Sequence, residues 1–346
     1  MKLEFVLFVS SFLTACPAFA DIAKLGVVVV DEVTQAPIPN VTVRGGFEMD
    51  AGWRAWTDSC HPNEDVRVTD GEGRCNVQGK TNCGRAGIAV RTVPSGYYKP
   101  GLGKAFQFKE KDVLGVWSPD DLVVTIRLQR VGFPIPLKVK RVGNHVNRSR
   151  VGYVDGTNSV FKYDLIRGDY LPPDGKGEVA DMEVASRLCM LSVTNISRQT
   201  KRFFDFATTV SFPGDGNGVV TVATSPTDGV RLRTAPETGY VPQTTVRCGF
   251  RRKPVPPNVY SESYSESDPD RGYYFRIRSQ FDDEGRLIGA YYGKVYGDFL
   301  VGCRLKEGCS VEFLYYVNPN SLDRNLEWDC RSNIFPEIGP YTDSQP

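Results

Sequence analysis

Hydrophobic residues recur at every second position, or in short β-branched runs, along most of the chain. Gly, Pro, Asn or Asp residues bound these segments, as is typical of strands joined by turns. No segment shows the 3.6-residue period of an amphipathic helix, so the pattern predicts an all-β protein built from β-sandwiches. The expected strands include residues 25–30, 41–43, 66–68, 88–93, 122–128, 188–193, 219–222, 273–277 and 311–317.

A change in composition divides the chain near residues 132–150. The segment 132–136 (Gly-Phe-Pro-Ile-Pro) breaks the preceding strand, and residues 127–150 carry seven Lys or Arg and no acid. This predicts a first β-sandwich over residues 21–131, a basic linker over 132–150 and a second all-β domain over 151–346. Within the second domain, a proline-rich break followed by the Ser- and acid-rich residues 261–270 predicts an exposed loop.

The N-terminus has the three-part layout of a secretory signal peptide over residues 1–20. A Lys near the start precedes an apolar stretch that is too short to be a permanent membrane-spanning helix. Residues 18–20 (Ala-Phe-Ala) form a cleavage pattern that predicts release at Asp21 and a secreted or periplasmic protein. Residues 13–16 (Leu-Thr-Ala-Cys) resemble a bacterial lipobox, so the alternative is lipidation at Cys16 and anchoring at the outer face of a membrane.

Cysteine usage supports export independently of the signal peptide. Without Cys16, the nine cysteines leave an even set that is typical of disulfides in an oxidising compartment, although buried free thiols are the alternative. Three precede residue 132 and five follow residue 150, so complete pairing requires at least one bridge between the domains. Spacing suggests that Cys303 and Cys309 close a local hairpin but does not establish connectivity. The predicted disulfide cysteines are Cys60, Cys75, Cys83, Cys189, Cys248, Cys303, Cys309 and Cys330.

Three motifs in the first domain resemble the carboxypeptidase regulatory-like domain. They are the apolar run 26–31, the turn and strand at 37–43 (Pro-Ile-Pro-Asn-Val-Thr-Val), and the turn at 69–74 (Thr-Asp-Gly-Glu-Gly-Arg), expected to be a hairpin turn. The resemblance covers about residues 22–130 and implies a transthyretin-like sandwich of the carbohydrate-binding-like type. Such domains are non-catalytic appendages of exported proteins, so it implies an accessory role. The chain departs from the family in its long segment 46–64 and at Cys75.

A search for catalytic signatures predicts no catalytic residue, metal ligand set or cofactor. The chain has two histidines, His61 and His145, with no H-x-x-x-H arrangement, and it has no G-x-S-x-G motif. A glycoside hydrolase that uses two carboxylates in the C-terminal domain stays open as an alternative, because the separation of its acids is set in three dimensions. The candidate acids are Asp169, Asp174, Glu178, Asp181, Glu183, Asp298, Glu312, Asp323 and Glu327.

Aromatic residues give the clearest indication of binding. Four Tyr-Tyr pairs occur in predicted strands, where neighbouring side chains point to opposite faces, so one ring of each pair could be exposed. Exposed rings could stack on sugars or anchor a protein, whereas ordinary cross-strand packing is the alternative. The candidate ligand-contact aromatics are Trp53, Trp56, Tyr98, Tyr274, Tyr292 and Tyr316.

The charge balance narrows the class of partner. The chain has 42 Lys and Arg against 41 Asp and Glu, which argues against nucleic acid. The sequence therefore predicts an exported, non-catalytic accessory or binding protein of the bacterial cell envelope or extracellular space, with glycan or an envelope protein as partner. The alternatives are the carboxylate-dependent glycoside hydrolase and a structural or adhesive surface protein. Membrane association is expected only if Cys16 is lipidated.

Overall fold

The computed structural model contains strands as its regular elements. It describes residues 21–48, 63–81, 83–100, 104–112, 115–118, 122–143, 157–196, 199–224, 232–255, 258–268, 270–304 and 308–335. Every regular element in these ranges is a β-strand, which confirms the all-β prediction. The same ranges contain no helix long and apolar enough to cross a membrane. The predicted signal peptide and Cys16 lie outside the described residues.

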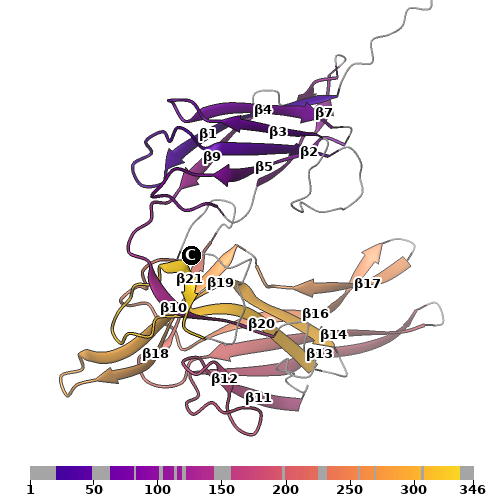
Figure 1. Ribbon diagram of the computed structural model, residues 1–346. Coiled ribbons are helices and arrows are strands. Elements are labelled where there is room, and N and C mark those ends of the chain that lie inside the picture. The colour runs from indigo at the N-terminus through magenta and orange to yellow at the C-terminus, as the bar shows by residue number, and fades with distance from the viewer. Residues whose placement is uncertain are drawn as a thin grey trace, which may run out of the picture. The chain divides into compact units, whose positions relative to one another are not determined.

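The chain forms two compact units, and each unit is built from three separate segments of the sequence. Unit 1 comprises residues 1–30, 34–94 and 103–126, and unit 2 comprises residues 31–33, 95–102 and 127–346. The chain therefore passes between the units more than once, whereas the sequence predicted a single linker. Figure 1 labels the strands of both units.

Unit 1 contains a three-stranded sheet, a four-stranded sheet and a short two-stranded ribbon. The three-stranded sheet has the order β4-β1-β9 and the four-stranded sheet the order β3-β2-β5-β6, while β7 pairs with β8. The strands are β1 (Ile22–Asp31), β2 (Thr42–Phe47), β3 (Glu64–Val68), β4 (Arg74–Lys80), β5 (Arg85–Thr92), β6 (Lys104–Gln107), β7 (Glu110–Lys111), β8 (Trp117–Ser118) and β9 (Val123–Leu128).

Strand β1 supplies much of the core of unit 1. Its alternate residues Ala23, Leu25, Val27 and Val29 are almost fully buried, with the two-residue period of a strand. The turn at residues 70–73 is present, and the Asp70 carboxylate accepts backbone N–H groups from Glu72 and Arg74. It does not form the expected hairpin, because β3 pairs with β2 while β4 pairs with β1 in the other sheet. The turn therefore carries the chain from one sheet to the other.

Unit 2 is built from two six-stranded sheets. Sheet I has the order β15-β18-β19-β20-β10-β21, and sheet II has the order β12-β11-β13-β14-β16-β17. The strands are β10 (Ile135–Val142), β11 (Thr157–Asp164), β12 (Asp169–Tyr170), β13 (Met182–Ile196), β14 (Gln199–Ser211), β15 (Gly218–Ala223), β16 (Gln243–Val255), β17 (Asn258–Ser265), β18 (Arg271–Phe281), β19 (Leu287–Arg304), β20 (Gly308–Val317) and β21 (Trp328–Asn333).

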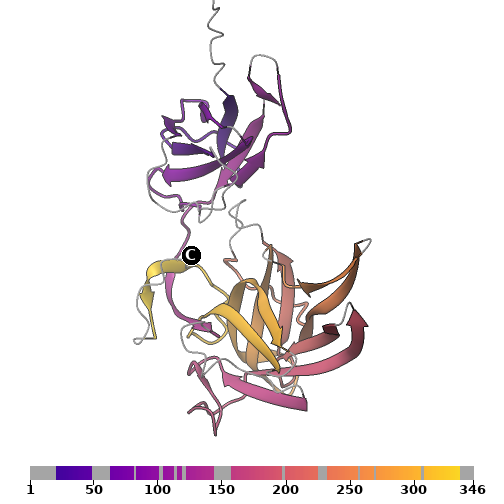
Figure 2. The same cartoon turned by 90° about the vertical axis from the view of Figure 1, so that its right-hand side faces the viewer.

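The two sheets of unit 2 share one hydrophobic core, and Figure 2 shows them layered against each other. Phe212, directly after β14 of sheet II, stacks on Phe275 of sheet I with ring centroids 5.7 Å apart. Tyr163 of β11 meets Tyr315 of β20 edge to face at 6.2 Å. Aromatic pairs of this kind add to the free energy gained from apolar burial, so they help to hold the sheets together.

Segments that follow β15 and β20 cover the outer face of sheet I. Ala235 and Leu326, from two such segments, pack with Ala290 and Tyr292 of β19 in a separate buried cluster. Backbone hydrogen bonds join the covering segments to each other, including Leu326 N–H to the Arg233 carbonyl at 2.6 Å. This second layer buries side chains that strand alternation alone would leave in water.

Two segments that the sequence placed outside strands are strands in the structure. Residues 135–142, expected within the basic linker, form β10, which lies between β20 and β21 in sheet I. The linker was predicted from the positive charge of this segment. In the structure its residues alternate, with Leu137 and Val139 buried while Lys138 and Lys140 bond loop carbonyls. Residues 261–265, expected in a loop, belong to β17, because hydrogen bonding to β16 stabilises a strand whose two faces are both polar.

Candidate functional site

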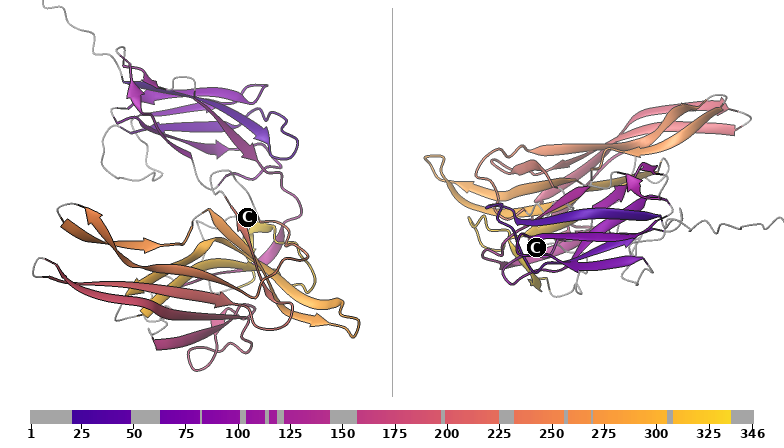
Figure 3. Two further views of the ribbon diagram at one scale, coloured as in Figure 1. Left: turned by 180° about the vertical axis from the view of Figure 1, so that it is seen from behind. Right: turned by 90° about the horizontal axis from the view of Figure 1, so that it is seen from above.

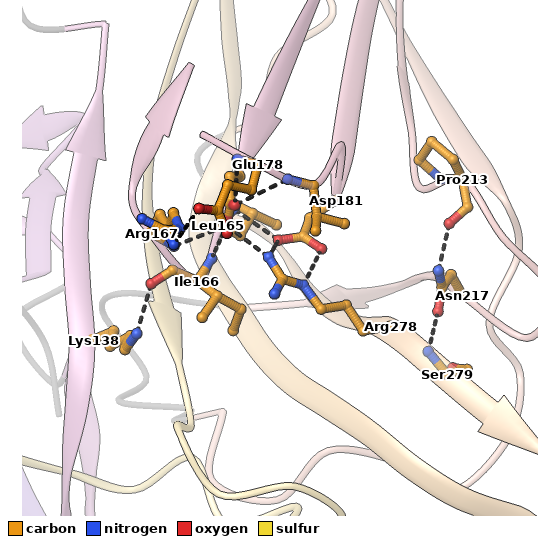
Figure 4. A network of polar contacts seen from close by, with 12 residues as sticks. Lys138, Leu165, Ile166, Arg167, Glu178, Asp181, Pro213, Asn217, Arg278 and Ser279 are labelled. Atoms are coloured by element: carbon orange, nitrogen blue, oxygen red, sulfur yellow. Dashed lines mark hydrogen bonds and ion pairs between the residues drawn. The ribbon is translucent and has the colours of Figure 1, made fainter. Parts of the chain in front are cut away.

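The most extensive buried polar network of the described residues joins the two sheets of unit 2. Arg278 of β18 donates to Asp164 Oδ1 at 2.7 Å through Nη2, and to Asp181 through Nε at 2.8 Å and Nη2 at 2.9 Å. Both carboxylates are almost fully buried. Figure 4 shows Arg278 directed at Asp181 and at the loop that follows β11. One guanidinium thus bridges two acids that lie on either side of that loop.

Local backbone geometry directs Arg278 into this network. The residue has a φ of 53° and lies at an irregularity in the β18 and β19 pairing, between Ile277 and Gln280. A bulge changes the direction of a side chain relative to the regular pleat. A non-glycine residue in the left-handed region costs free energy, which the buried ion pairs offset.

The backbone of the loop supplies the remaining hydrogen bonds. Asp164 accepts N–H groups from Ile166, Arg167, Glu178 and Val179. Burial by itself would raise the pKa of Asp164, but these N–H groups together with Arg278 lower it. Burial raises the pKa of Asp181 despite its bonds to Arg278, and the nearby charge of Asp164 adds to that rise. Every described contact of this network holds the loop between Asp164 and Asp181 in place.

Asp298 and Glu327 are buried carboxylates with similarly complete sets of donors. Asp298 accepts the Tyr273 hydroxyl at 2.5 Å and Arg271 Nη1 at 2.8 Å. Glu327 accepts the backbone N–H groups of Gly132 at 2.7 Å and Phe133 at 2.8 Å, and the Tyr98 hydroxyl at 2.8 Å. Burial opposes ionisation of Glu327, but these donors and Arg233 lower its pKa. Both acids hold their neighbouring chain segments in place.

Several of the acids considered for a glycosidase therefore anchor segments of the protein itself. Asp181, Asp298 and Glu327 bond to arginines, hydroxyls and backbone N–H groups of their own unit. Glu312 pairs with Arg141 at 3.0 Å and Glu183 with Lys162 at 2.9 Å. An acid and base pair for glycoside hydrolysis needs carboxyl groups that face a substrate, and these five carboxylates face protein donors.

Most of the predicted ligand-contact aromatics lie in the protein interior. Tyr292 and Tyr316 are 3% and 0% exposed, so the prediction that they contact a ligand is wrong. Tyr316 packs among Leu137, Val139 and Trp328 of its own sheet, with the Trp328 ring centroid 5.7 Å away, and the covering segments of sheet I bury Tyr292. Tyr274 is half-buried against the same layer, and burial raises its pKa to about 12. Cross-strand and layer packing thus accounts for these three rings.

The remaining candidate aromatics have different outcomes. Tyr98 is half-buried, its hydroxyl bonds Glu327, and the Arg233 guanidinium lies 5.4 Å from its ring centroid. The ring and the hydroxyl both serve contacts inside unit 2. Trp53 and Trp56 lie outside the described residues, so their role as ligand contacts stays a prediction.

Three of the cysteines expected in disulfides are thiols in the structure, namely Cys75, Cys83 and Cys189. Cys75 lies opposite Val27. Cys83 Sγ lies 3.5 Å from the Glu48 carbonyl oxygen. Cys189 is exposed and falls at the irregularity between Leu188 and Met190 in β13. These positions depart from the prediction that all eight cysteines pair.

Cys248 is buried in the core of unit 2. Cys60 and the side chains of Cys303, Cys309 and Cys330 lie outside the described part of the chain.

The two thiols Cys75 and Cys189 should differ in reactivity. Burial, together with Asp70 and Asp65, raises the pKa of Cys75 to about 11, which reduces its reactive thiolate roughly 100-fold relative to an ordinary thiol. Cys189 is exposed. In a time course with iodoacetamide followed by peptide mass spectrometry, we expect Cys189 to be alkylated well before Cys75. Equal rates in the folded protein would contradict the described environment of Cys75.

The outer face of sheet II is open, in contrast with the covered face of sheet I. We call the open face the surface formed by Ala185 and Arg187 of β13, Ala207 and Thr209 of β14, and Thr245 and Arg247 of β16. Arg187, Thr245 and Arg247 are exposed and the other three are half-buried. Figure 3 shows the long strands of this sheet, which run beyond the region where the sheets pack. Sequence reasoning missed this face because its side chains are small and polar.

Register places the open-face residues in two rows across the strands. Ala185 lies opposite Thr209, and Thr209 lies opposite Thr245. In the neighbouring row, Ala207 lies between Arg187 and Arg247. Arg247 pairs with Asp205 at 3.3 Å, and Arg187 is exposed. The face therefore presents hydroxyls and an available guanidinium over a floor of methyl groups.

Comparisons with known proteins returned distant structural matches. No protein-family model and no curated protein matches the chain. The minor pilin GBS52 of Streptococcus agalactiae matches at 19% identity over 34% of this chain and 48% of its own length, with a TM-score of 0.23. The major pilin BcpA of Bacillus cereus matches at 9% identity over 84% of this chain and 95% of its own, with the same TM-score. The major pilin SpaD of Corynebacterium diphtheriae matches at 9% identity over 87% of this chain and 56% of its own length, with a TM-score of 0.23.

The chain spans about half the length of the minor pilin that it matches. TM-scores of 0.23 at these identities do not assign a shared fold family or a function. The functional argument therefore rests on the geometry of this chain.

Proposed function

We propose that the protein is an exported, non-catalytic binding protein that holds a polar glycan on the open face of sheet II. The observation that carries the proposal is the contrast between the two sheets of unit 2, since protein segments cover one outer face and the open face is available. The signal peptide pattern and the cysteine content of the sequence support export.

The chemistry of the open face suits a glycan that carries some negative charge. Thr209 and Thr245 offer hydroxyls that can donate and accept hydrogen bonds to sugar hydroxyls. Arg187 and Arg247 are two strands apart, which corresponds to about 10 Å across a sheet. The Arg187 guanidinium can bind a carboxylate or sulfate group in bidentate fashion, and the small Ala207 side chain between the two arginines leaves room for a sugar ring.

The first unit supports the accessory part of this proposal. Its three motifs resemble the carboxypeptidase regulatory-like family, and we propose that unit 1 is a non-catalytic appendage of that type. In the structure, the apolar run is the buried strand β1 and the Pro-Ile-Pro-Asn segment leads into β2. These features agree with the turn geometry that the resemblance implies.

A polysaccharide binding assay tests the proposal. The mature protein is passed over immobilised polygalacturonate, an acidic glycan, and dextran, a neutral one. We expect binding to polygalacturonate that weakens at least about tenfold in an Arg187→Glu, Thr209→Glu double variant, because like charge repels the ligand. Arg286→Glu, a charge reversal at an exposed residue of the β18 and β19 hairpin, is the matched control. Absence of binding to both glycans would count against the proposed function.

A structural or adhesive role is the second candidate, and strand β17 favours it. This strand of eight residues is at the end of the strand order of sheet II. An edge strand presents backbone groups that can pair with a strand from another chain. Light scattering across a concentration series would show self-association if this role is correct, whereas a monomer at all concentrations would favour the glycan-binding role.

A further inference from the structure

We infer that Cys303 and Cys309 form a disulfide that closes the tip of the β19 and β20 hairpin. The two strands pair in antiparallel fashion, and the register places Cys303 directly opposite Cys309. The next pair toward the tip is Arg304 with Gly308. This inference rests on the export of the protein, which is part of the proposed function, because the bond needs an oxidising compartment.

The backbone positions meet the geometric requirement for a disulfide. Residues directly opposite each other in an antiparallel pair have Cα atoms about 4.5–5.5 Å apart. Disulfide-bonded cysteines usually have Cα atoms about 4.4–6.8 Å apart. The bond can therefore form without movement of either strand.

Other described cysteines occupy positions that face a different residue type. Cys75 lies opposite Val27, and Cys248 lies between Phe206 and Ser265. Cys189 falls at an irregularity of β13. The opposed pair in β19 and β20 is thus distinguished by its register rather than by its spacing in the sequence.

A covalent link would stabilise the tip of the β19 and β20 hairpin. The ladder between β19 and β20 is interrupted between Tyr296 and Leu300, so the pairs from Leu300 to Arg304 form a separate outer section. Val301 and Val311 of this section are buried in the core, whereas Leu300 is 50% exposed, so the section is covered on one face only. A short ladder of this kind is marginal by itself, and a cross-link would prevent its opening.

Formation of the bond is a two-electron oxidation. The thiolate of one cysteine attacks a disulfide donor, such as the active-site disulfide of a thiol oxidase or oxidised glutathione, and displaces one donor thiol. The second cysteine then attacks the mixed disulfide and displaces the other donor thiol. The protein loses two protons and two electrons in total, and the donor is reduced to two thiols.

Tryptic mapping under non-reducing conditions tests the pairing directly. Free thiols of the secreted protein are first blocked with iodoacetamide in denaturant. Trypsin then cuts after Arg304 and Lys306, which lie between the two cysteines. We expect the Cys303 and Cys309 peptides to stay linked, with a mass about 2 Da below the sum of the separate peptides, and to separate on reduction. Separate alkylated peptides, or linkage of either cysteine to another, would overturn the assignment.

A second arm separates the pairing from export. Purified reduced protein is incubated with oxidised glutathione and mapped in the same way, so the result does not depend on where the protein is made. We expect the same linked peptides in the wild type and in Cys75→Ser, and their loss in Cys309→Ser. If the pair forms with glutathione but the cellular protein is reduced, the proposed export is wrong while the register argument stands. Failure to form it with glutathione overturns the pairing itself.

Discussion

Replacement of Arg278 by alanine is expected to lower the free energy of unfolding by about 3–5 kcal/mol, because it leaves buried carboxylates without their counter-charge. Asp164 and Asp181 are 0% and 2% exposed, and Arg278 is the guanidinium that bonds both. The loop between these acids would lose one of its attachments to sheet I, while the bonds from Lys138 and Lys140 to its carbonyls would remain. Urea denaturation of the whole protein, monitored by tryptophan fluorescence, measures the change in the free energy of unfolding.

Two further variants show whether the effect belongs to the buried network. Arg278→Lys keeps the charge but cannot donate to both acids through one planar fork, so we expect an intermediate loss. Arg286→Ala removes an arginine of the same hairpin that pairs with Asp282 and Glu284 at the surface. It should change stability by less than about 0.5 kcal/mol. Equal losses in Arg278→Ala and Arg286→Ala would show that the network does not act as a buried anchor.

Replacement of Glu327 by glutamine is expected to cost about 3 kcal/mol of stability at neutral pH, since hydrogen bonds to an ionised acceptor are stronger than those to a neutral one. The glutamine amide can accept through its oxygen, but its NH₂ group faces donors. The backbone N–H groups of Gly132 and Phe133 would compete for one acceptor. Chemical denaturation at pH 7 gives the difference.

The loss in Glu327→Gln should depend on pH in a defined direction. The pKa of Glu327 is lowered in the folded protein, so the carboxylate contributes stability above the unfolded pKa of about 4.3. That contribution is lost as the pH falls through the lower folded pKa. Wild type and variant should therefore converge below about pH 4. Glu284→Gln, at an exposed acid, is the control, and a gap that widens in acid would contradict the assigned direction.

The alternation of apolar and polar residues was sufficient to predict the fold class and the positions of many strands. Leu25, Val27 and Val29 are buried on one side of β1, within the strand predicted over residues 25–30. Alternation reports which face of a strand is apolar, and it therefore finds strands with one dry face. It failed at β17, where the Ser- and Tyr-rich sequence has no apolar side to report.

The candidate site could be predicted only in part from the sequence. The sequence offered Asp181 and Glu327 only as candidate glycosidase acids, and their donors come from residues such as Arg278 and Gly132, distant in the chain. The open face could not be found, because its residues are ordinary threonines, alanines and arginines. Their arrangement in rows depends on the register of β13, β14 and β16.

The sequence by itself determined that this is an all-β protein, since the two-residue period of a strand is a local property of the chain. The tertiary structure decided which faces are available, because burial depends on what packs above a strand. Tyr292 and Thr245 both lie in strands and point away from the sandwich core, yet covering segments bury the tyrosine and the threonine is exposed. It also placed Cys303 opposite Cys309, because register is a relation between two strands.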